Sequence, residues 1–325
     1  MSVQEAGVAY MNPRPGSGQA EGMTSRRDIE FPAEDGTILR GWLYEPEGEG
    51  PFPLVVMAHG FSAVKEMYLD DFAAAFADSG LAALVYDHRN LGASDGTPRG
   101  DIDPRQQIDD YRTAITFAAT LDAVDGDRIG VWGSSYSGAH VLVVAAVDRR
   151  VKCVVSQVPL VAGLETARRL VRGDHFAGLR AAFDGDRAAR FGGAEPAMIP
   201  VTWEDDPAEP CALPTADSHD FFFGPITSRA PSWKKEVTLR SVERFVEYEP
   251  QTYVPMISPT PLLLVVAEGD HLVPADLALR AYASALEPKK LLVLPGGHFE
   301  AYVDANFATS IEVQREWFRT HLRGK

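Results

Sequence analysis

The feature that most constrains the fold is an alternation of short apolar runs with amphipathic stretches, repeated along most of the chain. Wholly apolar runs such as 53–60 and 81–87 have the length of strands buried on both faces of a sheet. A stretch with helical spacing follows the first run, with Leu69, Phe72 and Phe76 on one side. Strands that alternate with helices form right-handed crossovers and a mostly parallel sheet. The sequence therefore predicts an α/β fold.

The full pattern predicts eight strands. Asp35-Gly36 is typical of a hairpin turn between two antiparallel strands at the N-terminal side. The six later strands are predicted at 53–60, 81–87, 127–133, 151–158, 261–270 and 289–298. Helices are predicted at 67–80, 104–121, 136–147 and 274–286, and in the stretch that ends at Leu322.

One interval interrupts this alternation. Residues 160–255 separate two successive strands and are far too long for an ordinary loop. They contain weakly helical stretches around a proline-rich middle, so we expect a helical cap inserted into a core formed by 25–159 and 256–325. A Gly-, Pro- and Ser-rich segment, 1–24, is expected to be flexible. The interval is rich in aromatic residues: Phe176, Phe183, Phe191, Trp203, Phe221, Phe222, Phe223 and Trp233. Each is more typical of the cap's own core, but some must face whatever the cap covers.

Charge and composition exclude several classes of function. The formal net charge is −15, and basic residues occur at most in pairs, which argues against a nucleic-acid partner. No run of about 18 apolar residues is present, so no membrane span is predicted. Cys153 and Cys211 do not form a disulfide framework or a metal-ligand spacing. With no secretory signal, we expect a cytoplasmic protein without a metal or cofactor.

Three serines lie in the stretch "GVWGSSYSGAH", where a predicted strand meets the next helix. A serine on such a sharp turn is exposed, and the residues two before and two after it must be small. Ser135 has Gly133 and Ser137 at that spacing. A tryptophan would crowd the turn if Ser134 were the nucleophile. Ser137 also has small neighbours but would fall inside the helix, so the pattern favours Ser135 over Ser137.

A serine hydroxyl becomes a nucleophile when a base takes its proton. His298 follows the last predicted strand and Asp270 follows the strand before it, at the sheet edge where Ser135 is expected. A carboxylate there can hold the imidazole in the required tautomer and orientation. We therefore predict Ser135, His298 and Asp270 as a catalytic triad, with Glu268 as the alternative acid. His140 is expected to pack within its helix instead.

An acyl-transfer site also needs N–H donors for the negatively charged oxygen of the intermediate. The backbone N–H of Tyr136, directly after the nucleophile, is the first candidate. The loop after the first buried strand is expected to supply the second. Gly60 lets that loop turn inward, and Phe61 is the expected donor through its N–H. A plain strand-ending turn is the alternative for this loop.

Taken together, five motifs resemble those of the α/β-hydrolase family. They are "HGF" (59–61), "YDHRNLGASDG" (86–96), "GSSYSG" (133–138), "EGDHLVP" (268–274) and "GGHF" (296–299). The resemblance implies the α/β-hydrolase fold and the chain order Ser, Asp, His. It is narrower for a branch whose members are called polyketide transferase, thiohydrolase or dienelactone-hydrolase-like protein. Position 137 is Ser where the family often has Gly. We expect Arg89, in the second motif, to pair with a carboxylate rather than contact substrate.

The prediction is a serine hydrolase that cleaves a carboxylic ester, thioester or lactone through an acyl-enzyme. Its partner would be a small-molecule acyl substrate, apolar or aromatic if the cap residues line the pocket. The alternatives are an acyltransferase or a peptidase or amidase with the same triad, and a non-catalytic ligand-binding protein on this scaffold. Dehalogenases and epoxide hydrolases with an aspartate nucleophile are disfavoured, because position 135 is serine. Association into a homo-oligomer is left open.

Overall fold

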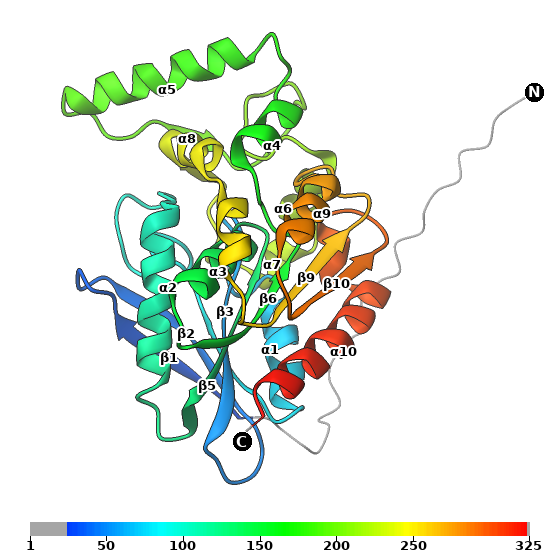
Figure 1. The fold of residues 1–325 in the computed structure, drawn as a ribbon. Helices are drawn as coiled ribbons and strands as arrows, with labels where there is room; N and C mark the ends of the chain where they lie inside the picture. Colours follow the sequence, from blue (N-terminus) through cyan, green and yellow to red (C-terminus); the bar gives the residue numbers. More distant parts are fainter. Residues whose placement is uncertain (1–24, 324–325) are drawn as a thin grey trace, which may run out of the picture.

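The computed structural model describes residues 25–323, so the predicted flexible segment 1–24 lies outside the described residues. An eight-stranded sheet crosses the molecule in the order β1-β2-β4-β3-β5-β6-β9-β10 (Figure 1). β2 pairs antiparallel with β1 and β4, and all other neighbours are parallel. The strands are β1 (Ser25–Pro32), β2 (Ile38–Glu45), β3 (Phe52–Ala58), β4 (Ala82–Tyr86), β5 (Val124–Ser134), β6 (Val151–Gln157), β9 (Leu262–Ala267) and β10 (Lys289–Leu294). The predicted mostly parallel, eight-stranded α/β sheet is confirmed.

The N-terminal hairpin forms where the sequence predicted it. β1 and β2 pair antiparallel, with Pro32 opposite Ile38 at the end next to the turn. Gly36 in that turn has φ of +85°, a left-handed conformation that glycine adopts without steric cost. The hairpin therefore follows from local turn chemistry alone.

Helices cover both faces of the sheet, which explains why the central strands are apolar throughout. β4 and β9 are buried along their whole length. One buried cluster packs α2, α3 and α9 against the sheet, and a second packs α1 and α10 against the opposite face. These helices are α1 (Leu69–Ala77), α2 (Pro104–Ala118), α3 (Tyr136–Val147), α9 (Ala275–Ser284) and α10 (Asp304–His321). Each lies where a helix was predicted, although α2 ends three residues before the predicted 121.

The stretch 160–255, which we call the insertion, lies between β6 and β9. It gathers at the end of the sheet toward which β9 and β10 point (Figure 1). Its elements are α4 (Gly163–Leu170), α5 (Phe176–Phe191), β7 (Met198–Pro200), α6 (Ala216–Phe223), α7 (Ile226–Arg229), β8 (Glu236–Thr238), α8 (Leu239–Glu247) and the start of the 3₁₀ helix Pro250–Met256. β7 and β8 form a two-stranded antiparallel sheet that the sequence analysis did not predict.

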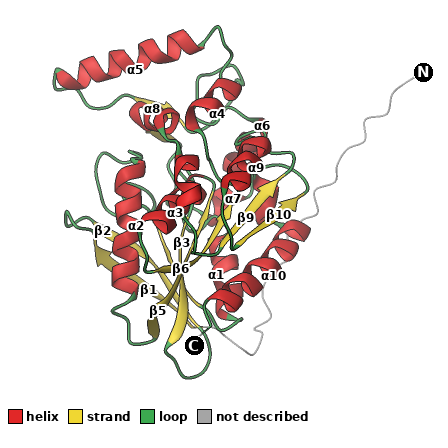
Figure 2. Cartoon of the chain, viewed as in Figure 1, coloured by secondary structure: helices red, strands yellow, loops and turns green. Residues whose placement is uncertain are grey.

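The longest helix of the insertion, α5, was also missed. Its side chains are mostly exposed, and only Phe183 and Asp186 are buried. Figure 2 shows it as a rod that stands away from the rest of the molecule. A helix that buries so little carries a weak apolar periodicity, so the pattern used to predict the other helices is absent here. Phe191 at its end is 97% exposed and therefore faces solvent rather than a pocket.

Ion pairs tie the insertion to the core. Asp101, in the loop after β4, accepts hydrogen bonds from Arg240 and Arg244 of α8. Arg229 of α7 pairs with Asp70 at the start of α1 at 2.7 Å. These contacts hold the insertion across the loops that follow β3 and β4.

Among the described residues, no helix has the length and apolar character needed to cross a bilayer.

Candidate active site

Ser135 occupies the turn between β5 and α3. Its φ of 58° and ψ of −115° are unusual for a residue with a side chain and mark a strained turn. Neighbouring backbone holds it there. The N–H of Ser135 donates to the carbonyl of Gln157 at 2.8 Å, and its carbonyl accepts from the N–H of Leu160 at 3.2 Å. These hydrogen bonds hold the strained turn in place. The turn presents the Ser135 hydroxyl at the carboxyl ends of the parallel strands.

The other two serines of the motif are committed elsewhere. Both are fully buried, whereas Ser135 is only partly buried. The Ser134 hydroxyl hydrogen-bonds to the hydroxyl of Tyr302 at 2.5 Å. The Ser137 hydroxyl donates to the carbonyl of His59. Of the three candidates, only Ser135 has a hydroxyl that solvent or a substrate can reach.

Close packing around the turn requires the glycines. A Cβ on Gly133 would lie 2.1 Å from the carbonyl oxygen of Ser137, so the position two before Ser135 admits no side chain. A Cβ on Gly60 would lie 2.6 Å from Cβ of Ser135. The loop after β3 therefore runs directly against Ser135, as the sequence predicted for a loop that turns inward.

The structure brings Ser135, His298 and Asp270 together. Nε2 of His298 lies 3.0 Å from Oγ of Ser135, and its Nδ1 lies 2.7 Å from Oδ2 of Asp270. A carboxylate only accepts hydrogen bonds, so Nδ1 carries the proton and Nε2 is left to accept the serine proton. The imidazole is 1% exposed and the aspartate 6%, which keeps water from competing for these bonds.

Asp270 is held in place by its second oxygen. Oδ1 accepts the backbone N–H groups of Leu272 and Val273, at 3.0 and 2.8 Å. These two bonds fix the carboxylate plane so that Oδ2 faces His298. The alternative acid, Glu268, is exposed at the end of β9 and makes no hydrogen bond to His298.

The two residues predicted to donate their backbone N–H groups to the oxyanion, Phe61 and Tyr136, lie beside Ser135. Tyr136 is the first residue of α3, and the N–H groups of a first helical turn have no partner within the helix. The N–H of Phe61 makes no hydrogen bond to any described residue. Both residues flank Ser135, Tyr136 along the chain and Phe61 through its neighbour Gly60.

Sequence analysis missed a buried polar cluster beneath the turn. Nε2 of His88 lies 2.7 Å from Oγ of Ser137, and Nδ1 of His59 accepts the N–H of Gly60 at 2.7 Å. Burial lowers the pKa of His59 and of His88 to about 3, so both imidazoles are neutral at neutral pH. The residues belong to quoted motifs, but no spacing rule could have shown that they meet.

Arg89 has the role that the sequence predicted. Its guanidinium makes a two-pronged contact with Asp110 of α2, at 2.7 and 2.6 Å, and a further bond to Asp35 in the hairpin turn. The bonds to Asp110 raise the pKa of Arg89 above its ordinary value. Arg89 thus fastens the loop after β4 to the core.

Some aromatic residues of the insertion reach the site and others do not. Phe221 of α6 stacks on Phe299 at 4.3 Å between ring centroids, and Phe299 lies edge-on to His298 at 4.9 Å. Trp233 stacks on Phe222 at 5.1 Å. These rings belong to one buried cluster that also contains Phe61 and Tyr136. By contrast, Trp203 stacks on His219, and both residues lie within the insertion.

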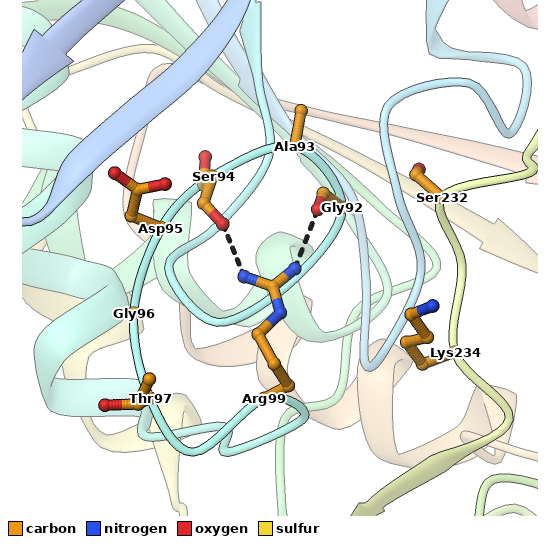
Figure 3. Close-up of a pocket in the computed structure, with 9 residues that line it drawn as sticks. All are labelled: Gly92, Ala93, Ser94, Asp95, Gly96, Thr97, Arg99, Ser232 and Lys234. Atoms are coloured by element: carbon orange, nitrogen blue, oxygen red, sulfur yellow. Dashed lines mark hydrogen bonds between the residues drawn. The ribbon is translucent and has the colours of Figure 1, made fainter.

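Two cavities formed by the described residues have no triad residue in their lining. One, of about 640 Å³, is bordered by the loop Gly92–Thr97, Arg99, Ser232 and Lys234 (Figure 3). Arg99 turns back onto its own loop, donating to the carbonyls of Gly92 and Ser94. The second, of about 580 Å³, lies between α2 and α8 and includes Arg244 and Tyr248. Within residues 25–323, no group of three or more His, Cys, Asp or Glu side chains is arranged to hold a metal ion.

Comparison with known proteins identifies relatives of this chain. Residues 53–305 match the family described as alpha/beta hydrolase fold. The chain is 33% identical to a thiohydrolase of Eupenicillium brefeldianum over 306 residues, covering 93% of this chain and 96% of that protein. It is 31% identical to the quorum-quenching protein AidA of Acinetobacter baumannii, covering 90% and 94%. The crystal structure of the α/β hydrolase GrgF from Penicillium superposes with a TM-score of 0.79 at 29% identity, covering 92% and 99%.

Proposed function

The chain belongs to the α/β-hydrolase family, and from that premise we propose that it is a serine hydrolase cleaving a carboxylic ester, thioester or lactone through an acyl-enzyme. Membership of the family, and the predicted likeness to its thiohydrolase and polyketide transferase branch, are confirmed by the matches. The observation that carries the proposal is the line of contacts from Ser135 through His298 to Asp270. The substrate would be a small molecule that carries an acyl group.

The contacts support a two-step reaction. Ser135 Oγ attacks the substrate carbonyl while Nε2 of His298 takes its proton, and Asp270 stabilises the imidazolium that forms. The intermediate's negatively charged oxygen accepts the N–H groups of Phe61 and Tyr136. The leaving alcohol or thiol departs with the proton from His298. A water molecule then gives a proton to His298 and attacks the acyl-enzyme, and His298 passes that proton to Oγ of Ser135 as the acid is released.

The insertion, 160–255, is proposed to act as a cap over a core of 25–159 and 256–325. Phe221 and Trp233 support this role, because they share a buried apolar cluster with Phe61 and Tyr136. An apolar or aromatic acyl group would suit such walls. A cytoplasmic location is proposed from the two cysteines, both of which are free thiols.

Covalent labelling tests the proposal directly. A fluorophosphonate probe should modify the wild-type protein at Ser135, and peptide mass spectrometry locates the adduct. Ser135→Ala should remove labelling and lower kcat for p-nitrophenyl esters by about 10⁴-fold or more. Ser156→Ala, which changes a fully buried serine of β6, serves as the control. A wild-type protein that neither labels nor turns over any ester or thioester would favour the non-catalytic ligand-binding alternative.

Acyl transfer is the second candidate, because several relatives carry such names. The chain is 31% identical to "Polyketide transferase grgF" and to "Acyltransferase drtE", covering 91% and 92% of its length. An alcohol or amine would then replace water in the second step. Product analysis with and without an added acceptor alcohol distinguishes the two reactions. Comparing p-nitrophenyl ester with anilide turnover tests the peptidase or amidase alternative.

A further inference from the structure

The hydroxyl of Ser137 joins the start of α3 to the loop after β3, two segments that the proposed reaction needs in a fixed relation. Ser137 lies on the first turn of α3, two residues after Ser135, and is fully buried. Its Oγ donates to the carbonyl oxygen of His59, which immediately precedes Gly60 and Phe61. The proposed nucleophile's helix is therefore hydrogen-bonded to the loop that carries the proposed oxyanion donor.

The peptide between His59 and Gly60 is held at both ends. Its carbonyl accepts the Ser137 hydroxyl, and its N–H donates to Nδ1 of the His59 ring at 2.7 Å. Nε2 of that ring in turn donates to the carbonyl of Met67 at 2.8 Å. A planar trans peptide held by both its oxygen and its N–H has one orientation.

This orientation passes to the next peptide, which contains the Phe61 N–H. The Gly60 carbonyl accepts the N–H of Ala63 at 3.3 Å, a long and weak bond. In a trans peptide the N–H points opposite to the carbonyl, so the direction of the Phe61 N–H depends on this plane. Gly60 packs closely against Ser135, since an added Cβ would lie 2.6 Å from Cβ of Ser135, so its backbone has little room to rotate. The contacts of the preceding peptide therefore help to set the direction of the donor, together with the packing of the buried Phe61 ring against Tyr136.

His88 determines which way the Ser137 hydroxyl points. Because Ser137 gives its single proton to His59, the 2.7 Å contact with His88 must be a donation from Nε2 of His88. Nδ1 of His88 is buried and makes no hydrogen bond to the described residues. Donation by His88 occupies a Ser137 lone pair and leaves the hydroxyl proton directed at the His59 carbonyl.

We infer that Ser137, oriented by His88, is a positioning residue that keeps the Phe61 N–H aimed at the reacting carbonyl oxygen. The inference rests on the proposed function. It gives a role to the one position where the serine motif departs from the glycine that the family often has. The competing explanation is that Ser137 only satisfies a buried carbonyl.

Ser137→Ala separates these explanations. Loss of an oxyanion donor costs about 10²–10³-fold in kcat, and a misdirected donor should cost part of that, about 10-fold, with KM within about 2-fold. Binding of a trifluoromethyl ketone, which forms an oxyanion with Ser135, should weaken by the same factor. Binding of the product acid should change by less than about 2-fold. If Ser137 had only a structural role, its loss would weaken the binding of both ligands by a similar factor.

Ser156→Ala is the matched control, because Ser156 is also fully buried and its Oγ donates to a carbonyl of α3, that of Gly138, at 2.8 Å. All rates are measured well below the Tm of each variant. If Ser137→Ala matches Ser156→Ala in kcat and in ketone binding, the inference is overturned while the proposed function stands. If the wild-type protein shows neither turnover nor labelling, both fall.

Variants of His88 keep the test decisive should Ser137→Ala fail to fold. His88→Gln retains an N–H donor near the position of Nε2 and should keep kcat within about 3-fold of the wild-type value. His88→Leu removes the donor and should show the same separation of kcat from KM as Ser137→Ala. Equal kcat values for His88→Gln and His88→Leu would overturn the inference.

Discussion

The floor of the candidate site and the insertion above it are built in opposite ways. Along α3, which begins beside Ser135, every residue from Tyr136 to Ala146 is buried. Along α5, in the insertion, only two side chains are. Helix α3 is fixed by packing on all sides, whereas α5 contacts the rest of the protein through few side chains.

The glycines show the same difference at atomic scale. A Cβ at Gly133 would meet backbone at 2.1 Å, whereas a Cβ at Gly178 or Gly185 of α5 would meet nothing within 4 Å. A catalytic geometry must be held to a fraction of an ångström, which only the packed region can do. The comparison teaches that tolerance to substitution differs within the molecule: the backbone around Gly133 admits no side chain, whereas α5 has open space at Gly178 and Gly185.

After the loss of Ser135 itself, the largest expected effect comes from removing the orienting carboxylate in the floor. In Asp270→Asn the amide can present an N–H to Nδ1 of His298 and so favour the wrong tautomer. We expect kcat to fall by about 10³–10⁴-fold with the fold intact. Steady-state kinetics and circular dichroism measure the two quantities.

Glu268→Gln is the matched control, because it changes the exposed alternative acid two residues earlier and should leave kcat within about 2-fold. The assignment of the acid would be wrong if Glu268→Gln were the more damaging substitution.

A smaller effect is expected from acid, and it should arise in the floor. Burial lowers the pKa of His59 and His88 to about 3, from an ordinary 6.5, so the unfolded chain binds more protons between these values. The free energy of unfolding should therefore be highest above pH 6.5 and fall as pH drops toward 3. The slope is about 1.4 kcal/mol per pH unit for each histidine, or about 4 kcal/mol for both between pH 7 and 5.

Urea unfolding at pH 7 and pH 5 measures this loss of stability. His88→Gln replaces one titrating group and should remove about 2 kcal/mol of the difference between the two pH values. An unchanged difference would show that this imidazole is not held neutral by burial.

The smallest expected effect lies in α5, where the substitution should stabilise the structure instead of destabilising it. Gly185→Ala places a methyl group in open space within a helix, where alanine is favoured over glycine by about 0.5–1 kcal/mol. Local opening of α5 should become about 2–5-fold rarer. The rate of trypsin cleavage at Arg180 and Arg187 reports that opening, and activity should not change. Faster cleavage would contradict the view that α5 is stabilised mainly by its own helix propensity.

Much of the site could be predicted because its residues follow strand ends. Strand ends in a parallel sheet meet at one edge, so Ser135, Asp270 and His298 could be brought together from three distant segments. The inward loop at Gly60 followed from the same rule. In contrast, the contact of His88 with Ser137 depends on how a side chain of the loop after β4 meets one on the first turn of α3, and no periodicity records that.

Local sequence determined where the core, outside the insertion, forms strands and helices, because continuous apolar runs and helical spacing report burial on two faces or on one. It also determined the sharp turn at Ser135, since only small residues fit around it. Tertiary structure decided what lies around those elements: the exposed course of α5, the pairing of β7 with β8, and the neutral histidines beneath the turn. Each of these depends on contacts between segments that are far apart in the chain, so it cannot be predicted from the sequence of any one segment.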